Sequence, residues 1–212
     1  METNPFPPQQ QRSRQTLERL LKACVRTLDR DGLEGCTLPR IAVEAGVSPA
    51  TVYRRFADKD ALLCAAFLDI LQRSNDANRE NVPKSILRPT LEETAERLVD
   101  SLIRQYRTHP RLLRALSLFV DTHAGSDFSN EARQLIANNL QLVSAVLLKH
   151  RKSIRHPNPQ RAVSFAVLNV TSSIETIVFD GNSLWQVTLP LDDAKLSAEL
   201  TRSLIAYLRY DP

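Results

Sequence analysis

The sequence contains little glycine. Its 212 residues include 5 glycines, about a third of the usual share. Hairpins and tight loops depend on glycine, so this shortage favours an all-α fold. Hydrophobic residues at 42% and charged residues at 25% are ordinary for a globular protein that buries a core. The formal net charge of +4 permits a polyanionic partner without requiring one.

Cysteine is also scarce, and the three cysteines are odd in number with no C-x-x-C pair. Cys24 and Cys64 lie within apolar helical patterns, where a small buried thiol is a more common role than a redox sensor. The first residues lack the apolar run of a signal peptide, and no window contains eighteen apolar residues. A cytoplasmic protein without a membrane span is therefore expected.

The motifs of enzymes are missing. The sequence has no H-E-x-x-H, no Glu-x-x-His, no glycine-rich phosphate loop and no G-x-S-x-G. His109, His123, His150 and His156 are scattered without the spacing of metal ligands. We therefore expect neither an enzyme nor a protein that holds a metal or cofactor.

Apolar residues recur at helical spacing along most of the chain, and no segment has a convincing strand pattern. Residues 1–12 are rich in Pro and Gln and are expected to be disordered. Asp58 is a predicted N-cap for a helix through Leu71, and the polar residues 75–89 with two prolines are expected to form a loop. Further helices are predicted at 14–30, 38–45, 91–108, 111–123, 130–155, 159–180 and 192–210.

Between residues 37 and 56, two short helical patches flank a bend. Thr37 can cap the first patch, Gly46 suits a turn that needs positive φ, and Ser48 followed by Pro49 suits the start of the second patch. At about 100° per residue, Val52 shares one face of the second patch with Phe56. That face is predicted to pack on the first patch.

The opposite face of the second patch carries Ala50 and Arg54, with Thr51 and Tyr53 on its flanks. Such a face suits a helix in the DNA major groove, because small side chains approach base edges while Arg54 reaches guanine or a phosphate. The phenol of Tyr53 can donate to a phosphate. The alternative is an ordinary helical corner whose charged face is solvated.

The stretch TLPRIAVEAGVSPATVYRRFADKDALL, residues 37–63, closely resembles the DNA-binding domain of TetR-family transcriptional regulators. The shared elements are Ile-Ala, Ala-Gly-Val-Ser, Tyr-x-x-Phe and an acidic-Lys-acidic-x-Leu-Leu segment. Two residues depart from the family pattern: Asp60 replaces the commoner Glu, and Arg54 stands where His is frequent. The resemblance covers residues 14–72.

The resemblance implies that Lys59, at the start of the next helix, meets a phosphate, with Thr37 and Arg40 as further backbone contacts. It also implies base contacts from the second patch. Arg12 and Arg14 on the N-terminal arm either reach the DNA or are simply solvated. The predicted DNA-binding residues are Thr37, Arg40, Ser48, Ala50, Thr51, Tyr53, Arg54 and Lys59.

The resemblance further implies a helix-turn-helix domain at 13–57, a connecting helix at 58–74 and a ligand-binding and dimerisation bundle at 75–212. In the family, a homodimer binds a palindromic operator, usually as a repressor, and a small-molecule effector releases it. The last two long helices, 161–180 and 192–210, are the dimer candidates. The pocket candidates are Phe119, His123, Asn169 and Trp185.

Two alternatives stay open. The chain is either a sequence-tolerant DNA-binding dimer without a ligand response, or a protein-binding adaptor whose DNA-binding head is vestigial. A specific regulator keeps a tight palindromic site in moderate salt, whereas non-specific binding collapses. For the adaptor, replacing Tyr53 and Arg54 by alanine leaves function intact.

Overall fold

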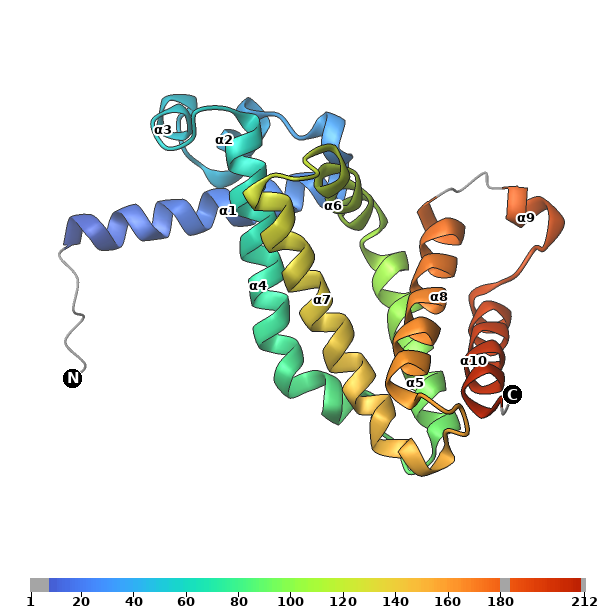
Figure 1. Ribbon diagram of the computed structural model, residues 1–212. Helices are drawn as coiled ribbons and strands as arrows, with labels where there is room; N and C mark the ends of the chain where they lie inside the picture. The colour runs from blue at the N-terminus through green and yellow to red at the C-terminus, as the bar shows by residue number, and fades with distance from the viewer. Residues whose placement is uncertain (1–7, 180–183, 211–212) are drawn as a thin grey trace. The chain divides into compact units, whose positions relative to one another are not determined.

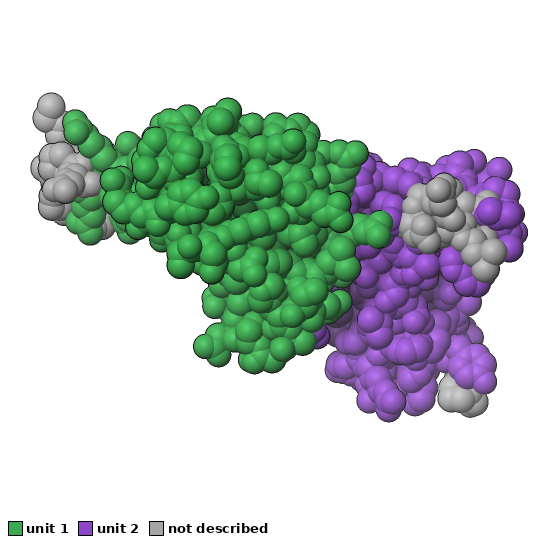
Figure 2. All heavy atoms as spheres, turned by 90° about the horizontal axis from the view of Figure 1, so that it is seen from above, with its two compact units in different colours: residues 1–71, 111–132 green, residues 72–110, 133–212 purple. Residues whose placement is uncertain are grey.

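The computed structural model describes residues 8–179 and 184–210, and these residues form helices and connecting turns without a strand (Figure 1). The all-α prediction is confirmed. The chain divides into two compact units (Figure 2). Unit 1 consists of Met1–Leu71 and Arg111–Ala132, and unit 2 consists of Gln72–Pro110 and Arg133–Pro212.

Unit 1 contains the helix-turn-helix region. Its helices are α1 (Pro8–Gly35), α2 (Leu38–Ala45), α3 (Pro49–Tyr53), the first part of α4 (Lys59–Ile86), α6 (Pro110–Thr122) and the start of α7 (Asp127–Leu147). A row of aromatic rings holds α4, α6 and α7 together, because Phe67 lies 5.4 Å from Phe119, which lies 5.3 Å from Phe128. All three rings are buried. On α6, Arg111 also donates a hydrogen bond to the backbone carbonyl of Arg30 on α1.

Unit 2 is a bundle in which α5 (Leu91–Thr108), α8 (Pro159–Phe179) and α10 (Asp193–Arg209) pack against one another. Its remaining described elements include a 3-10 helix, η1 (Leu148–Ser153), and the short α9 (Leu184–Thr188). Thr90 caps α5 by accepting from the Glu93 N–H, and the Glu93 carboxylate accepts from the Thr90 N–H. This reciprocal capping box fixes where α5 begins, at the predicted residue.

Helix α4 corrects one prediction. Residues 75–86, expected to belong to a loop, continue α4 as far as Ile86, with Pro83 inside the helix. The amide of Asn75 donates to the Leu135 carbonyl of α7 at 3.0 Å, and the amide of Asn78 reaches Asn139 at the same distance. The polar residues that resembled a loop therefore face a neighbouring helix.

Three other segments differ from the expected pattern. Helix α1 begins at Pro8, so residues 8–12 are helical although their composition predicts disorder; residues 1–7 lie outside the described residues. The helix predicted at 130–155 begins at Asp127 and passes into η1 after Leu147. Helix α9 has no counterpart among the predicted helices.

Helix α8 has the length and mean hydropathy, 1.6 over its most apolar window, of a membrane span. Polar residues such as Asn169 and Thr171 interrupt α8, so it contains no window of eighteen apolar residues, as the sequence indicates. The buried face of α8, with Val163, Val167 and Ile174, belongs to the hydrophobic core of unit 2. A core helix explains the composition without a membrane.

The prediction that Cys24 and Cys64 are buried thiols is confirmed in part. Cys24 is fully buried in α1, as predicted, and so is Cys36 after the end of α1, whereas Cys64 on α4 is half-buried. The thiols of Cys24 and Cys36 share a hydrogen bond, and this bond together with burial raises the pKa of Cys24 far above its usual value. A thiol held in its protonated form is a packing group rather than a nucleophile.

Candidate nucleic-acid interface

Gly46 makes the turn between α2 and α3. Its backbone has φ 63° and ψ 42°, the left-handed conformation that glycine adopts without steric cost. The N–H of Gly46 donates to the Val43 carbonyl and that of Val47 to the Ala42 carbonyl, each at 3.0 Å. These bonds satisfy the last carbonyls of α2 and redirect the chain into α3. The predicted turn is confirmed.

The capping side chains differ from expectation. Thr37 and Ser48 occupy the N-cap positions of α2 and α3 with extended backbones, but neither side chain caps its helix. The Ser48 hydroxyl instead pairs with the Thr51 hydroxyl at 3.0 Å. Pro39 and Pro49 lie in the first turns, where no N–H is needed, so the helices start without a side-chain cap.

Helix α3 presents two faces, as its periodicity predicts. Val52 is fully buried, and α3 packs against α2, in which Ile41 and Ala42 are also fully buried. Tyr53 is 57% exposed, and Arg54 is exposed in the turn that closes the helix. Ala50 is exposed and Thr51 is half-buried.

Lys59 is the first residue of α4, and the residue before it caps the first turn of this helix. The Asp58 carboxylate accepts from the Ala61 N–H at 2.8 Å, so the predicted cap is confirmed. The Lys59 ammonium is half-buried and donates to the Leu33 carbonyl at 2.8 Å. In this arrangement the ammonium links the start of α4 to the last turn of α1.

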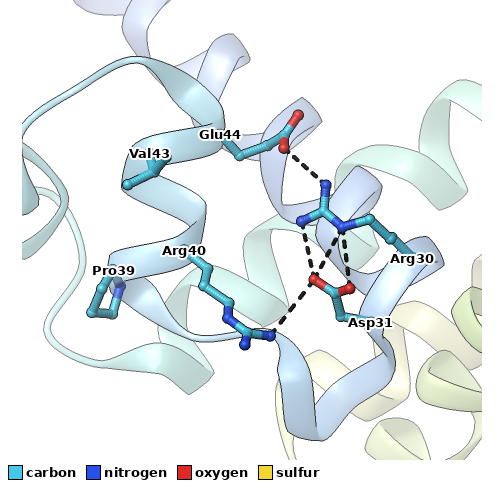
Figure 3. Close-up of a pocket in the computed structure, with 6 residues that line it drawn as sticks. All are labelled: Arg30, Asp31, Pro39, Arg40, Val43 and Glu44. Atoms are coloured by element: carbon cyan, nitrogen blue, oxygen red, sulfur yellow. Dashed lines mark hydrogen bonds and ion pairs between the residues drawn. The ribbon is translucent and has the colours of Figure 1, made fainter.

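Arg40 belongs to a chain of ion pairs on α1 and α2 that lines a surface pocket (Figure 3). Its guanidinium donates to the Gly35 carbonyl at 3.2 Å and lies 3.8 Å from the Asp31 carboxylate. The Arg30 guanidinium lies 3.0 Å from the Asp31 carboxylate and 3.1 Å from the Glu44 carboxylate, so it bridges the two. Arg26 completes the chain at 2.8 Å from Glu44.

This ion-pair chain orients Arg40 more than it stabilises the fold. Hydrogen bonds from Arg30 lower the pKa of Asp31, and those from Arg26 and Arg30 lower the pKa of Glu44, so both carboxylates stay ionised near neutral pH. Exposed ion pairs contribute little to folding. Arg40 remains 60% exposed, with its guanidinium held in place beside α2.

Arg55 is a functional candidate that the sequence did not identify. It follows α3, and its guanidinium donates to the Ser13 carbonyl at 3.0 Å and to the Ser13 hydroxyl at 2.8 Å. Periodicity places Arg55 near a face boundary but carries no information about a partner 42 residues away. Arg55 thus ties the first turns of α1 to the end of α3.

The pocket candidates are divided between the two units. The Phe119 ring on α6 lies 4.0 Å, between centroids, from the ring of His123, which follows the end of α6, and His123 also lies 3.6 Å from the Asp60 carboxylate. Both residues are part of unit 1. Asn169 and Trp185 lie exposed on α8 and α9 of unit 2.

Unit 2 contains a polar pair that the sequence pattern does not reveal. The Tyr106 hydroxyl donates to the Glu175 carboxylate at 2.7 Å, and the Tyr106 ring lies 5.5 Å from Phe179. Burial and this hydrogen bond raise the pKa of Tyr106. The available signal was Glu175 itself, a lone carboxylate in the apolar part of α8.

Comparison with known proteins places both parts of the chain in one group. The family described as bacterial regulatory proteins, tetR family, matches residues 20–66. A second family, described as tetracyclin repressor-like, C-terminal domain, matches residues 90–208.

Individual relatives agree with these family matches. The repressor DrrR1 of Streptomyces coeruleorubidus is 34% identical over 99 residues, which are 47% of this chain and 34% of DrrR1. The regulator BetI of Stenotrophomonas maltophilia is 40% identical over 60 residues, 28% of this chain and 31% of BetI. The chain thus spans about a third of the length of the curated relatives it matches.

A solved structure extends the likeness to the fold of nearly the whole chain. A TetR-family regulator from Mesorhizobium loti superimposes with a TM-score of 0.70 at 20% identity, covering 93% of this chain and 96% of the other. At this identity the likeness concerns the fold alone.

Proposed function

Because the chain belongs to the TetR family of DNA-binding transcriptional regulators, we propose that it is a repressor that binds a palindromic operator as a homodimer and is released by a small molecule. The regulator acts in the cytoplasm, where it meets the operator. The observation that carries this proposal is the two-sided α3, with Val52 buried beneath an exposed Tyr53 and Arg54.

The proposed DNA contacts follow from the arrangement of the head. Tyr53 donates to a backbone phosphate, and Ala50 and Thr51 approach base edges in the major groove. Arg54 contacts guanine or a phosphate from the final turn. Further contacts to the backbone come from residues that flank α3, and Lys59 makes its contact by exchanging its bond to the Leu33 carbonyl for one to a phosphate. These flanking residues are Thr37, Arg40, Ser48 and Lys59.

The outer face of α8 supports the homodimer. Phe165 is 46% exposed and Leu168 is 53% exposed, one turn apart on the face opposite the core of unit 2. The Phe165 ring lies 5.4 Å from Tyr207, so this apolar surface continues onto α10. Exposed apolar side chains on two adjacent helices suit pairing with the same surface of a second copy.

Replacing Leu168 by glutamate is expected to convert the dimer into a monomer. The substitution leaves the fold intact because the side chain is exposed, but it places a charge in the contact between copies. Sedimentation measures the mass, and titration of a palindromic duplex selected by the wild-type protein measures affinity, which we expect to fall about 100-fold or more.

Leu118→Glu is the matched control. Leu118 is 49% exposed and lies on α6 of unit 1, outside the proposed contact, so this variant should remain a dimer with unchanged affinity. If Leu168→Glu also remains a dimer, the outer face of α8 is not the dimer contact.

The effector contacts in unit 2 are proposed to include the Tyr106 and Glu175 pair, beside Phe179. A carboxylate and a phenol within an apolar bundle orient a polar group of a small molecule, while the surrounding apolar side chains bury its remainder. An effector that changes the spacing of the two heads lowers operator affinity. Further candidates for effector contacts are the predicted residues Phe119, His123, Asn169 and Trp185.

A further inference from the structure

The first turns of α1 are helical without being packed into a core. Residues 10–15 are all exposed, and the buried positions of α1 begin at Leu20. An isolated polar helical segment is only marginally stable in water. The two hydrogen bonds from Arg55 to Ser13 attach this segment to the helix-turn-helix region at the end of α3. Figure 1 shows these turns projecting from the head on the side where α3 lies.

The same turns hold an unusual share of the positive charge. Residues 8–22 carry four basic side chains against one acidic side chain, Glu18, which gives +3 out of +4 for the whole chain. Arg12, Arg19 and Lys22 line one continuous hollow on the surface of α1 together with uncharged Gln15 and Thr16 and the single carboxylate of Glu18. Because a helix rises 1.5 Å per residue, Arg12 and Lys22 are about 15 Å apart along the axis.

Such a surface fits a polyanion with regularly spaced charges. Extended guanidinium and ammonium groups along a helix neutralise successive phosphates of one strand, and uncharged polar side chains between them add hydrogen bonds to the same backbone. Arg55 directs its guanidinium to Ser13, so its effect is to fix where the basic turns start relative to Tyr53 and Arg54.

We propose that the N-terminal turns of α1 form a second DNA-binding element, which contacts backbone phosphates flanking the groove read by α3, and that Arg55 is the positioning residue. This inference rests on the proposed DNA-binding function. It assigns Arg12, Arg19 and Lys22 to the backbone, so the element adds affinity and salt dependence without changing the preferred sequence.

The test compares two triple variants on a duplex selected by the wild-type protein. Arg12→Gln/Arg19→Gln/Lys22→Gln keeps good helix formers at all three positions. The control, which removes the same charge from exposed residues of unit 2, is Lys149→Gln/Arg151→Gln/Lys152→Gln. Because the first variant removes three bonds to phosphates from each protomer, and six from the dimer, its slope of log K against log salt should become shallower by about 5, while the control keeps the wild-type slope.

A second variant tests the positioning role of Arg55 separately from its positive charge. Arg55→Lys keeps the positive charge but loses the forked donor geometry that holds Ser13. Hydroxyl-radical footprinting should show weaker protection in the flanks for Arg55→Lys, while protection at the centre of each half-site is unchanged. Circular dichroism checks that the variants remain helical.

The possible outcomes distinguish this inference from the proposed function. A wild-type protein that selects no duplex overturns the proposed function and with it this inference. A wild-type protein that selects a duplex, combined with equal slopes for the two triple variants or full flank protection in Arg55→Lys, overturns the second DNA-binding element alone.

Discussion

Replacing Tyr53 and Arg54 together by alanine removes four contacts from the dimer and should weaken binding to the selected duplex by roughly 1,000-fold or more. Each contact of this kind contributes about 1–3 kcal/mol, and every 1.4 kcal/mol is a factor of about ten. Both side chains are exposed, while the adjacent Val52 is fully buried and holds α3 from behind. Binding is measured by titration at fixed moderate salt, with circular dichroism to check the fold.

The control removes the same two residue types elsewhere. Arg209 and Tyr210 are adjacent and exposed at the end of α10, and Tyr210 is 61% exposed. Arg209→Ala/Tyr210→Ala should bind the duplex as the wild type does. A head variant that retains full affinity would mean that Tyr53 and Arg54 do not contact the duplex.

Phe67→Ala should give the largest loss of stability, about 3–5 kcal/mol of unfolding free energy. The Phe67 side chain is fully buried on α4, and its ring contacts Phe119, which contacts Phe128 in turn. Truncation removes buried apolar area and leaves a cavity among three helices. Because domains are stable by only about 5–15 kcal/mol, unit 1 would lose much of its margin.

Urea denaturation measures this loss, with Tyr53→Ala as the control. Tyr53 is an aromatic residue of the same unit but is 57% exposed, so its truncation should change the unfolding free energy by no more than about 0.5 kcal/mol. Equal losses in the two variants would mean that the aromatic cluster does not support the head.

Local signals predicted the parts of the fold that local interactions determine. The Thr90 and Glu93 capping box explains why α5 begins where its apolar pattern does, and Gly46 placed the turn before α3. Helical periodicity also separated Val52 from Tyr53 and Arg54, because burial within so short a helix depends mainly on direction.

Longer-range contacts determined what the sequence could not predict. Asn75 and Asn78 in the second half of α4 satisfy their amides on α7, and this pairing is invisible in a single segment. The Ser74 hydroxyl accepts a second hydrogen bond from the Asn78 amide at 3.1 Å. Side-chain bonds of this kind override the loop-forming tendency of a polar segment that contains Pro83.

The residues of the candidate DNA interface likewise fall into two groups, those that a local pattern predicts and those that a long-range contact determines. Exposure of Tyr53, Arg54 and Arg40 follows from the pattern of each helix, whereas the bond between Arg55 and Ser13 joins residues 42 positions apart. The Tyr106 and Glu175 pair likewise joins α5 to α8 within unit 2. Periodicity shows which way a side chain points but does not identify the residue it meets.

Selection of bound duplexes from a random pool, run in parallel with the wild-type protein and the Tyr53→Ala/Arg54→Ala variant, tests DNA readout by α3. The wild type should enrich a palindrome whose half-sites lie about 34–36 Å apart, the distance between successive major grooves on one face of DNA. The variant should enrich no common sequence. Enrichment of the same palindrome by both proteins, or of none by the wild type, would contradict DNA readout by α3.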